Sequence, residues 1–287
     1  MPEPMKSQIL MSGLVFVESA RWHQGRFWFS DWGTQQIFAL DANGQHEVAI
    51  RISNRSAGQE EVARGPLCFD FLPDGRLLIV TGREGRILLR ENNGELSTYA
   101  DLAPISRFPW NDIVVDSRGN AYVGNTGFDF PGGGFAPGTI ALAGADSSVR
   151  TVAEGLAFPN GMAITSDKST LIVAESYGQK LTAFNIAEDG SLHDRRLWAA
   201  CEGYPDGICL DPENAIWYAD VPNQRCVRVC EGGHVLDAVN LDRGCFSCAL
   251  GGRDGKTLLV LAADWRGSKK MFDGPRTGQV LAFRISE

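Results

Sequence analysis

The chain has 287 residues, of which 44% are hydrophobic and 22% charged, values typical of a soluble globular protein with a sizeable core. The formal net charge is −8 without a basic cluster, which argues against nucleic acid or an anionic membrane as the partner. No apolar run approaches the ~20 residues of a membrane span, and the N-terminal apolar stretches are too broken for a signal peptide. Seven cysteines without the spacing of a disulfide framework favour a reducing compartment, so we expect a cytoplasmic protein.

One type of strand recurs six times along the chain, and each copy ends in a small or acidic residue. The end residues follow one another at intervals of 50, 44, 50, 45 and 44 residues. The six segments are 27–31, 77–81, 121–125, 171–175, 216–220 and 259–264. A fixed period in this range is the signature of a repeat architecture.

Each recurring strand has a strand-like neighbour on either side in sequence, with turns rich in Asp, Gly and Asn between them. The preceding strands are 20–22, 67–71, 113–115, 162–164, 208–210 and 248–250, and the following strands are 37–40, 87–89, 140–142, 181–184, 226–229 and 280–283. No stretch of 10–15 residues has a helical period. The pattern predicts an all-β, six-bladed β-propeller forming one domain over residues 1–287. Closure of the ring is expected from an outer strand near residues 8–15, paired with residues 278–285.

Three consecutive blades carry an amide or carboxylate side chain directly after a proline-containing turn and before the first strand. These residues are Asn111, Asn160 and Asp206, spaced by 49 and 46 residues. Taken alone, each motif is an ordinary turn. In a propeller, however, the first strand of each blade lines the central channel, so the three side chains should converge there. The corresponding position in the first blade holds Glu18, another oxygen donor.

The equivalent positions in the second and sixth blades hold Leu67 and Phe246, which we expect to wall the pocket. The four polar residues offer two carboxylates and two amide carbonyls, with neither His nor Cys among them. Hard oxygen ligands of this kind suit Ca²⁺ first, and Mg²⁺ or Mn²⁺ next. A zinc site would favour Cys and His, so these ligands do not predict zinc.

The sequence resembles the gluconolactonase/regucalcin (senescence marker protein) family of six-bladed propellers through nearly its whole length. The resemblance is most specific at Asn111-Asp112, at Pro159-Asn160-Gly161, at Pro205-Asp206-Gly207 and at Glu18. It implies that Glu18, Asn160 and Asp206 bind one divalent metal at the channel mouth, with Asn111 contacting the metal or the substrate. It also implies hydrolysis of sugar or other small lactones, supported by calcium, zinc, magnesium or manganese in different members.

We hypothesise a metal-assisted ester hydrolysis in which the metal polarises the lactone carbonyl and Asp206 acts as general base. Trp110 and Asn125 are further candidate substrate contacts, and Trp110 would make the pocket more aromatic than a sugar lactone needs. The loop 128–137, rich in glycine and aromatic residues, is either a lid over the site or a blade insertion.

Two other interpretations remain open. The same metal site could hydrolyse another ester or an organophosphate, which Trp110 and the aromatic loop favour. Alternatively, the propeller could be a non-catalytic metal-binding or interaction module, although clustered oxygen ligands at the channel mouth speak against this role. The partner is expected to be a small lactone or ester, and the sequence leaves the oligomeric state open.

Overall fold

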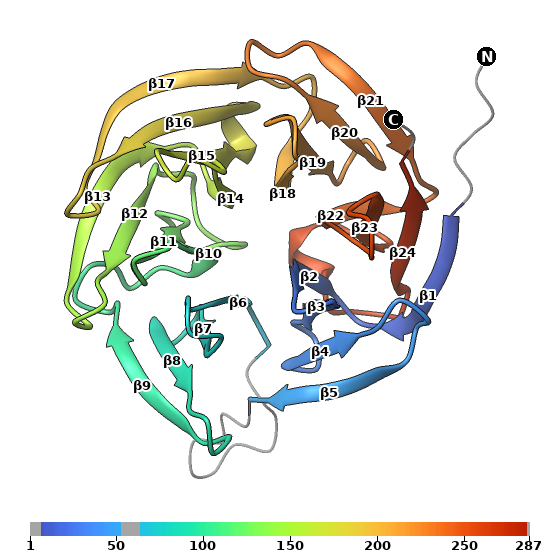
Figure 1. The fold of residues 1–287 in the computed structure, drawn as a ribbon, viewed down its shortest axis with the longest axis horizontal. Helices are drawn as coiled ribbons and strands as arrows, with labels where there is room; N and C mark the ends of the chain where they lie inside the picture. Colours follow the sequence, from blue (N-terminus) through green and yellow to red (C-terminus); the bar gives the residue numbers. More distant parts are fainter. Residues whose placement is uncertain (1–6, 53–63, 286–287) are drawn as a thin grey trace.

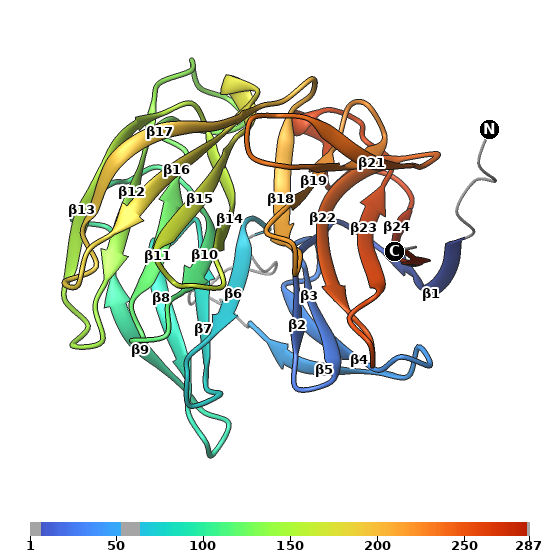
Figure 2. The same ribbon diagram turned by 45° about the horizontal axis from the view of Figure 1, so that its top comes forward.

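In the computed structural model, which describes residues 7–52 and 64–285, six four-stranded antiparallel sheets stand around a central axis (Figure 1). The chain runs around the ring in sequence order, and the first strand of each blade lies nearest the axis. The predicted all-β, six-bladed propeller is therefore confirmed. Figure 2 shows the inner strands β6, β18 and β22 running along the axis, so that the residues at their ends meet at the ends of the channel.

The strand bounds match the repeat found in the sequence. Blade 1 holds β2 (Val17–His23), β3 (Arg26–Asp31), β4 (Gln36–Leu40) and β5 (His46–Arg51). Blade 2 holds β6 (Leu67–Phe71), β7 (Leu77–Thr81), β8 (Arg86–Arg90) and β9 (Leu96–Asp101). Blade 3 holds β10 (Trp110–Val115), β11 (Ala121–Asn125), β12 (Gly138–Ala143) and β13 (Val149–Leu156).

The second half of the ring repeats the same order. Blade 4 holds β14 (Pro159–Ile164), β15 (Thr170–Glu175), β16 (Lys180–Ile186) and β17 (Leu192–Ala200). Blade 5 holds β18 (Pro205–Leu210), β19 (Ile216–Asp220), β20 (Arg225–Val229) and β21 (Val235–Asn240). Blade 6 holds β22 (Gly244–Gly251), β23 (Thr257–Ala263), β24 (Gly278–Arg284) and, as its outer strand, β1 (Ser7–Leu14).

Strand β1 closes the ring by pairing antiparallel with β24, from Ser7 opposite Phe283 to Leu14 opposite Gly278. The expected closure by an N-terminal strand is thus confirmed. Because the two ends of the chain share one sheet, opening the ring requires breaking this ladder of hydrogen bonds.

The core lies between neighbouring blades, where the second strands are covered on both faces. Every residue of β7, β11, β15 and β19 is buried, which explains why these strands appear in the sequence as nearly continuous apolar runs. The outer strands alternate or are largely exposed, as in β9 and β17. The described helices are two short 3₁₀ turns, η1 (Ser176–Gly178) and η2 (Ser268–Lys270).

Within the described part of the chain, no helix has the length and apolar character needed to cross a membrane. All seven cysteines are free thiols, and Cys68, Cys226, Cys245 and Cys248 are buried in strands.

Five of the six inner strands contain an irregular register near their start. The shifts lie after Glu18 in β2, after Trp110 in β10, after Pro159 in β14, after Pro205 in β18 and after Cys245 in β22. The sixth inner strand, β6, pairs with β7 without any shift. A bulge bends the strand and redirects a side chain, so these irregularities decide what faces the channel mouth.

Candidate active site

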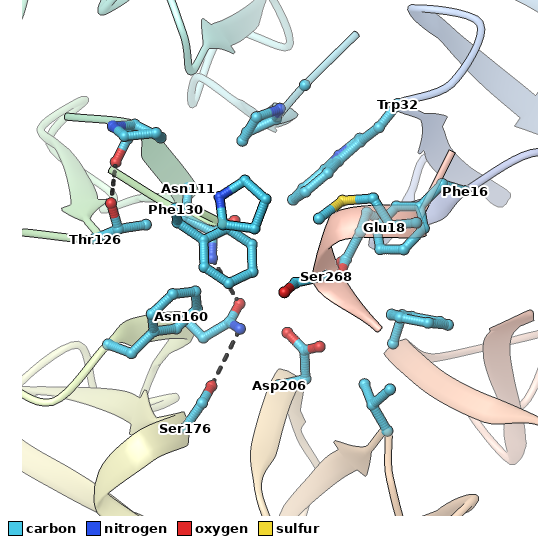
Figure 3. A pocket seen from close by; sticks show the side chains of 18 of the residues that line it. Phe16, Glu18, Trp32, Asn111, Thr126, Phe130, Asn160, Ser176, Asp206 and Ser268 are labelled. Atoms are coloured by element: carbon cyan, nitrogen blue, oxygen red, sulfur yellow. Dashed lines mark hydrogen bonds between the residues drawn. The ribbon is translucent and has the colours of Figure 1, made fainter. Parts of the chain in front are cut away.

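A cavity of about 350 Å³ opens at one end of the channel, and the four predicted oxygen donors all line it. Glu18, Asn111 and Asn160 are buried, whereas Asp206 is half-buried. Figure 3 shows their side chains approaching one another from different blades. The structure therefore brings together residues from β2, β10, β14 and β18.

The four polar residues lie at the start of the inner strands, within the bulges, and not in separate loops before the strands. The glycines of the two Pro-x-Gly motifs are required by close packing at the axis. A Cβ on Gly161 would lie 2.5 Å from the Asp206 carbonyl oxygen, and one on Gly207 would lie 2.4 Å from Ser247 Oγ. The motifs thus mark the place where neighbouring inner strands touch.

Each polar inner strand is also held by the last residue of the second strand of its own blade. We call Asp31, Asn125, Glu175 and Asp220 the strand-end anchors, because each bonds the backbone just before the site residue. Asp31 accepts hydrogen bonds from the amides of Val15 (3.1 Å) and Phe16 (3.0 Å), and Glu175 accepts one from Ala157 (2.7 Å). Asn125 donates to the Phe108 carbonyl (2.8 Å), and Asp220 accepts from the Tyr204 amide (3.2 Å).

A chain of hydrogen bonds orients the two amide side chains. Asn111 Nδ2 donates to Asn160 Oδ1 (3.0 Å), and Asn160 Nδ2 donates to Ser176 Oγ (3.2 Å), as Figure 3 shows. The Ser176 hydroxyl in turn donates to the Pro205 carbonyl oxygen (2.7 Å). Because Pro205 precedes Asp206, this chain links blades 3, 4 and 5 at the site.

The two carboxylates stand in an environment that disfavours their charge. Burial raises the pKa of Glu18 well above its ordinary value, and the neighbouring Asp206 raises it further. Burial likewise raises the pKa of Asp206, with the Asn160 amide opposing this effect. Asp206 Oδ1 is shielded from solvent and accepts no hydrogen bond from the described residues.

This donor set fits a divalent cation. A cation would offset the repulsion between Glu18 and Asp206 and would give the unpartnered Asp206 oxygen a ligand. Across residues 7–52 and 64–285, no three His, Cys, Asp or Glu side chains form a metal-binding group. The candidate site instead combines two carboxylates with two amide oxygens, the hard-ligand set that calcium accepts.

Arg21 and Asp112 form a buried ionic cluster that the sequence did not indicate. Arg21 Nη2 donates to Asp112 Oδ1 (2.8 Å) and to the Ile113 carbonyl (2.6 Å), and its Nε lies 3.7 Å from Asp70. The other Asp112 oxygen accepts from the Met162 amide (3.0 Å). Asp112 therefore ties the inner strands of blades 1, 3 and 4 together beside the site, and its own side chain is fully occupied.

The structure does not bring Trp110 to the cavity. Its side chain is completely buried against Gly85 and lies outside the residues that line the pocket. Successive residues of a strand point to opposite sides, so Trp110 faces the core because its neighbour Asn111 faces the cavity.

Asn125 is likewise enclosed rather than presented to a ligand. Only 1% of it is exposed, and its amide is engaged by the backbone of Phe108, Pro109 and Gly127. The loop 128–137, in contrast, contributes Phe130 and Pro131 to the cavity lining. The loop thus forms part of the cavity wall.

Nine aromatic side chains line the cavity, and most of them were not predicted from the motifs. Phe246 was expected there and is present, whereas Leu67, also expected there, is fully buried and lies outside the lining. Trp265 also lines the cavity. The lining residues that were not predicted include Phe16, Trp32, Arg83, Thr126, Phe158, Ser176, Tyr177, Tyr204, Val221, Ser268, Met271 and Phe272. The repeat itself holds a signal for many of them: the residue after each strand-end anchor and the residue two before each polar site residue both face the cavity.

Comparison with known proteins identifies a protein family that this chain matches. Residues 16–264 match the SMP-30/Gluconolactonase/LRE-like region. A 6-deoxy-6-sulfogluconolactonase from Pseudomonas putida is 27% identical over 229 residues, 76% of each chain. A pentonolactonase from Haloferax volcanii is 28% identical over 192 residues, 58% of this chain and 62% of that protein.

Among solved structures, a calcium-binding regucalcin from Agrobacterium tumefaciens superimposes with a TM-score of 0.75 at 18% identity, over 98% of this chain and 94% of that one. This likeness supports the fold. The relatives with named activities above are lactone hydrolases at low identity. Since the family match spans most of the propeller, the chain belongs to the SMP-30/gluconolactonase/LRE-like family.

Proposed function

We propose that this protein is a lactone hydrolase that uses one divalent cation, Ca²⁺ in the first instance and Mg²⁺, Mn²⁺ or Zn²⁺ as alternatives. Glu18, Asn160 and Asp206 hold the cation, and Asn111 is the fourth ligand or a substrate contact. The observation that carries the proposal is the convergence of these four side chains on one cavity, where Asp206 Oδ1 has no hydrogen-bond partner among residues 7–52 and 64–285. The lactonase names of the relatives support it.

When bound, a divalent cation supplies a Lewis acid for the lactone carbonyl. The protein's own residues supply orientation and proton transfer. Asp206 takes a proton from the attacking water and returns it to the ring oxygen as the carbon–oxygen bond breaks. Asn111 fixes the Asn160 amide through their hydrogen bond, which keeps the Asn160 oxygen directed at the cavity.

A hydrolase of another ester or of an organophosphate is the second candidate, because nine aromatic side chains line the cavity. Either reaction would use the same oxygen donors. If the protein turns over no ester, a non-catalytic binding role remains.

The test is hydrolysis followed with a pH indicator on protein stripped of metal, with Ca²⁺, Mg²⁺, Mn²⁺ or Zn²⁺ added back. The substrate panel runs from sugar lactones to aromatic and alkyl lactones, with simple esters and a phosphotriester included. We expect turnover that depends on the added cation. Thermal unfolding of the same samples gives a second readout, because a cation present at 100 times its Kd stabilises the folded state by about 2.7 kcal/mol.

Cation binding without turnover of any lactone would contradict the lactonase proposal and leave the second candidate or a binding role. Absence of any stabilising cation would contradict the metal site itself.

A further inference from the structure

Two aromatic walls face each other across the polar floor of the cavity. The first wall, on the side of blades 1 and 6, consists of Phe16, Trp32, Phe246, Trp265 and Phe272. Its rings contact one another, with centroid distances of 5.3 Å for Phe16 and Trp32 and 4.7 Å for Phe16 and Phe246. Figure 3 shows Trp32 and Phe16 on one side of Glu18 and Asp206, and Phe130 on the other.

The second wall, on the side of blades 3 and 4, consists of Phe130, Phe158 and Tyr177. Phe158 stacks on Tyr177 with ring centroids 4.7 Å apart and meets Phe130 edge-on at 5.0 Å. Aromatic pairs in these geometries hold each other in place, so the wall presents a fixed apolar surface.

Phe158, in the second wall, has a strained backbone conformation. Its φ is +62°, a left-handed conformation that bulky side chains rarely adopt. The neighbouring Ala157 amide is held by Glu175, and the Phe158 carbonyl accepts a bond from the Ser176 amide (3.1 Å). This conformation places an aromatic ring, where Asn or Gly would fit the backbone more easily, against the cavity.

Beyond the four oxygen donors, the charged and hydroxyl side chains that line the cavity are Arg83, Thr126, Ser176, Tyr177, Tyr204 and Ser268. The Thr126 hydroxyl is engaged by the Pro109 and Phe128 carbonyls, and the Ser176 hydroxyl by the Pro205 carbonyl. Glu18, Asn111, Asn160 and Asp206 are committed to the proposed cation site. A polyhydroxylated ring lying between the two aromatic walls would place several hydroxyls against apolar ring faces, where they give up water without gaining equivalent hydrogen bonds.

We propose that the site selects lactones bearing an apolar, ring-sized substituent beside the cyclic ester, which lies between the two aromatic walls, and disfavours polyhydroxylated sugar lactones. The proposal rests on the proposed lactonase function and narrows its substrate class. The cavity volume of about 350 Å³ lies at the small end of ligand pockets, which suits one lactone ring with one further ring.

The experiment compares kcat/KM for γ-phenyl-γ-butyrolactone and for glucono-δ-lactone on the cation-loaded protein. We expect the phenyl lactone to be preferred by about 100-fold, the scale on which an apolar pocket distinguishes added hydroxyls. Phe158→Asn, which suits the left-handed backbone, and Trp265→Ser, at a 39% exposed position, remove one ring from each wall. Each should lower this preference about tenfold.

Leu197→Ser is the matched control, because Leu197 is 62% exposed on the outer strand β17 and lies outside the cavity lining. It should leave the preference unchanged. The unfolding midpoint of each variant shows whether it has folded.

A binding measurement on metal-free protein separates this proposal from the proposed function. The hydrolysis-resistant lactam 5-phenylpyrrolidin-2-one should bind at least about tenfold more tightly than 2-pyrrolidinone, and Phe158→Asn should abolish the difference. Tight binding of the phenyl lactam without turnover of any lactone would overturn the lactonase function but support the apolar selection. Equal or better turnover of the sugar lactone, with no preference between the lactams, would overturn the apolar selection and leave the lactonase function standing.

Discussion

Blade 2 and its neighbour blade 3 have the same four-stranded architecture but face the cavity in different ways. In blade 3, β10 begins with a bulge that contains Asn111, and the preceding loop is held by the anchor Asn125. In blade 2, β6 begins with the fully buried Leu67 in unbroken register with β7. The equivalent strand-end residue, Thr81, bonds within its own hairpin, donating to the Arg86 carbonyl (3.4 Å).

This difference distinguishes the structural features that the propeller fold requires from those that the site requires. A blade pairs and buries its second strand equally well with or without a bulge, as the completely buried β7 and β11 show. The bulge and the strand-end anchor occur together in blades 1, 3, 4 and 5, which supply an oxygen donor, whereas the bulge of blade 6 presents Phe246 to the cavity. These two local features therefore belong to the site rather than to the propeller.

The largest effect expected from a change at a bulged position is at Asp206. Asp206→Asn keeps the size of the side chain but removes the proposed base, so kcat for a lactone should fall by about 10²–10⁴-fold. The cation should still raise the unfolding temperature, although at higher concentration. Asp237→Asn, on the outer strand β21 of the same blade, is the control and should behave as the wild type. Unchanged kcat in Asp206→Asn would remove this residue from the role of base.

Exchanging residues between the two kinds of inner strand tests the comparison directly. Asn160→Leu gives the bulged β14 the residue of blade 2 and removes one proposed ligand together with the partner of Asn111. Cation affinity, measured by calorimetry, should fall by at least about 100-fold, more than the loss of an outer-shell partner causes. Leu67→Asn places an amide in the regular β6, where no bulge turns it to the cavity, and should not raise cation affinity. A gain in affinity there would show that the bulge is dispensable.

The strand-end residues should differ in their contribution to stability. Asp220 is fully buried and accepts hydrogen bonds from the Tyr204 amide, from Asn223 Nδ2 (3.0 Å) and from Arg225 Nε (2.9 Å). Asp220→Ala leaves Arg225 without its carboxylate partner and leaves the Tyr204 amide and Asn223 without an acceptor, so it should cost about 3 kcal/mol of unfolding free energy in urea titrations. Thr81→Ala removes one weak bond and should cost about 1 kcal/mol or less. Similar losses in both variants would contradict a special role for the anchors.

Much of the fold could be predicted because its pattern is periodic. Strands covered on both faces must be apolar throughout, and the steps between their ends revealed six units. The convergence of Glu18, Asn111, Asn160 and Asp206 followed from placing one position of the repeat around a ring. The bulges could not be predicted, because a change of register depends on pairing between strands and has no signature in the amino-acid composition.

The aromatic lining was missed for a related reason. Trp110 was selected as a substrate contact because it is the aromatic neighbour of Asn111, yet strand alternation turns it into the core. Trp32 and Phe158 occupy repeat positions next to the anchors and site residues, where the sequence shows no shared residue type. Their exposure to the cavity depends on backbone conformation, as the left-handed Phe158 illustrates.

The smallest effect on stability is expected from removing the charge of the anchor Glu175 in blade 4. Burial acts to raise its pKa, but hydrogen bonds from the Ala157 amide (2.7 Å) and Thr182 Oγ1 (2.6 Å) outweigh it. Lys180 and Arg195, 3.5 and 3.0 Å away, act in the same direction, so the pKa lies below its ordinary value of 4.5. A depressed carboxyl pKa stabilises the fold above the unfolded-state pKa, and this contribution is lost as the pH falls through the folded-state pKa.

Glu175→Gln should therefore reduce the unfolding free energy by about 1 kcal/mol at pH 7, and the gap to the wild type should close as the pH falls below 4.5. Urea titrations between pH 3 and 7 measure both curves, with Glu154→Gln on the exposed face of β13 as the control. A gap that persisted unchanged at pH 3 would show that the charge of Glu175 does not hold the Ala157 amide. The anchor would then act through shape and hydrogen bonding alone, as the uncharged Asn125 does in blade 3.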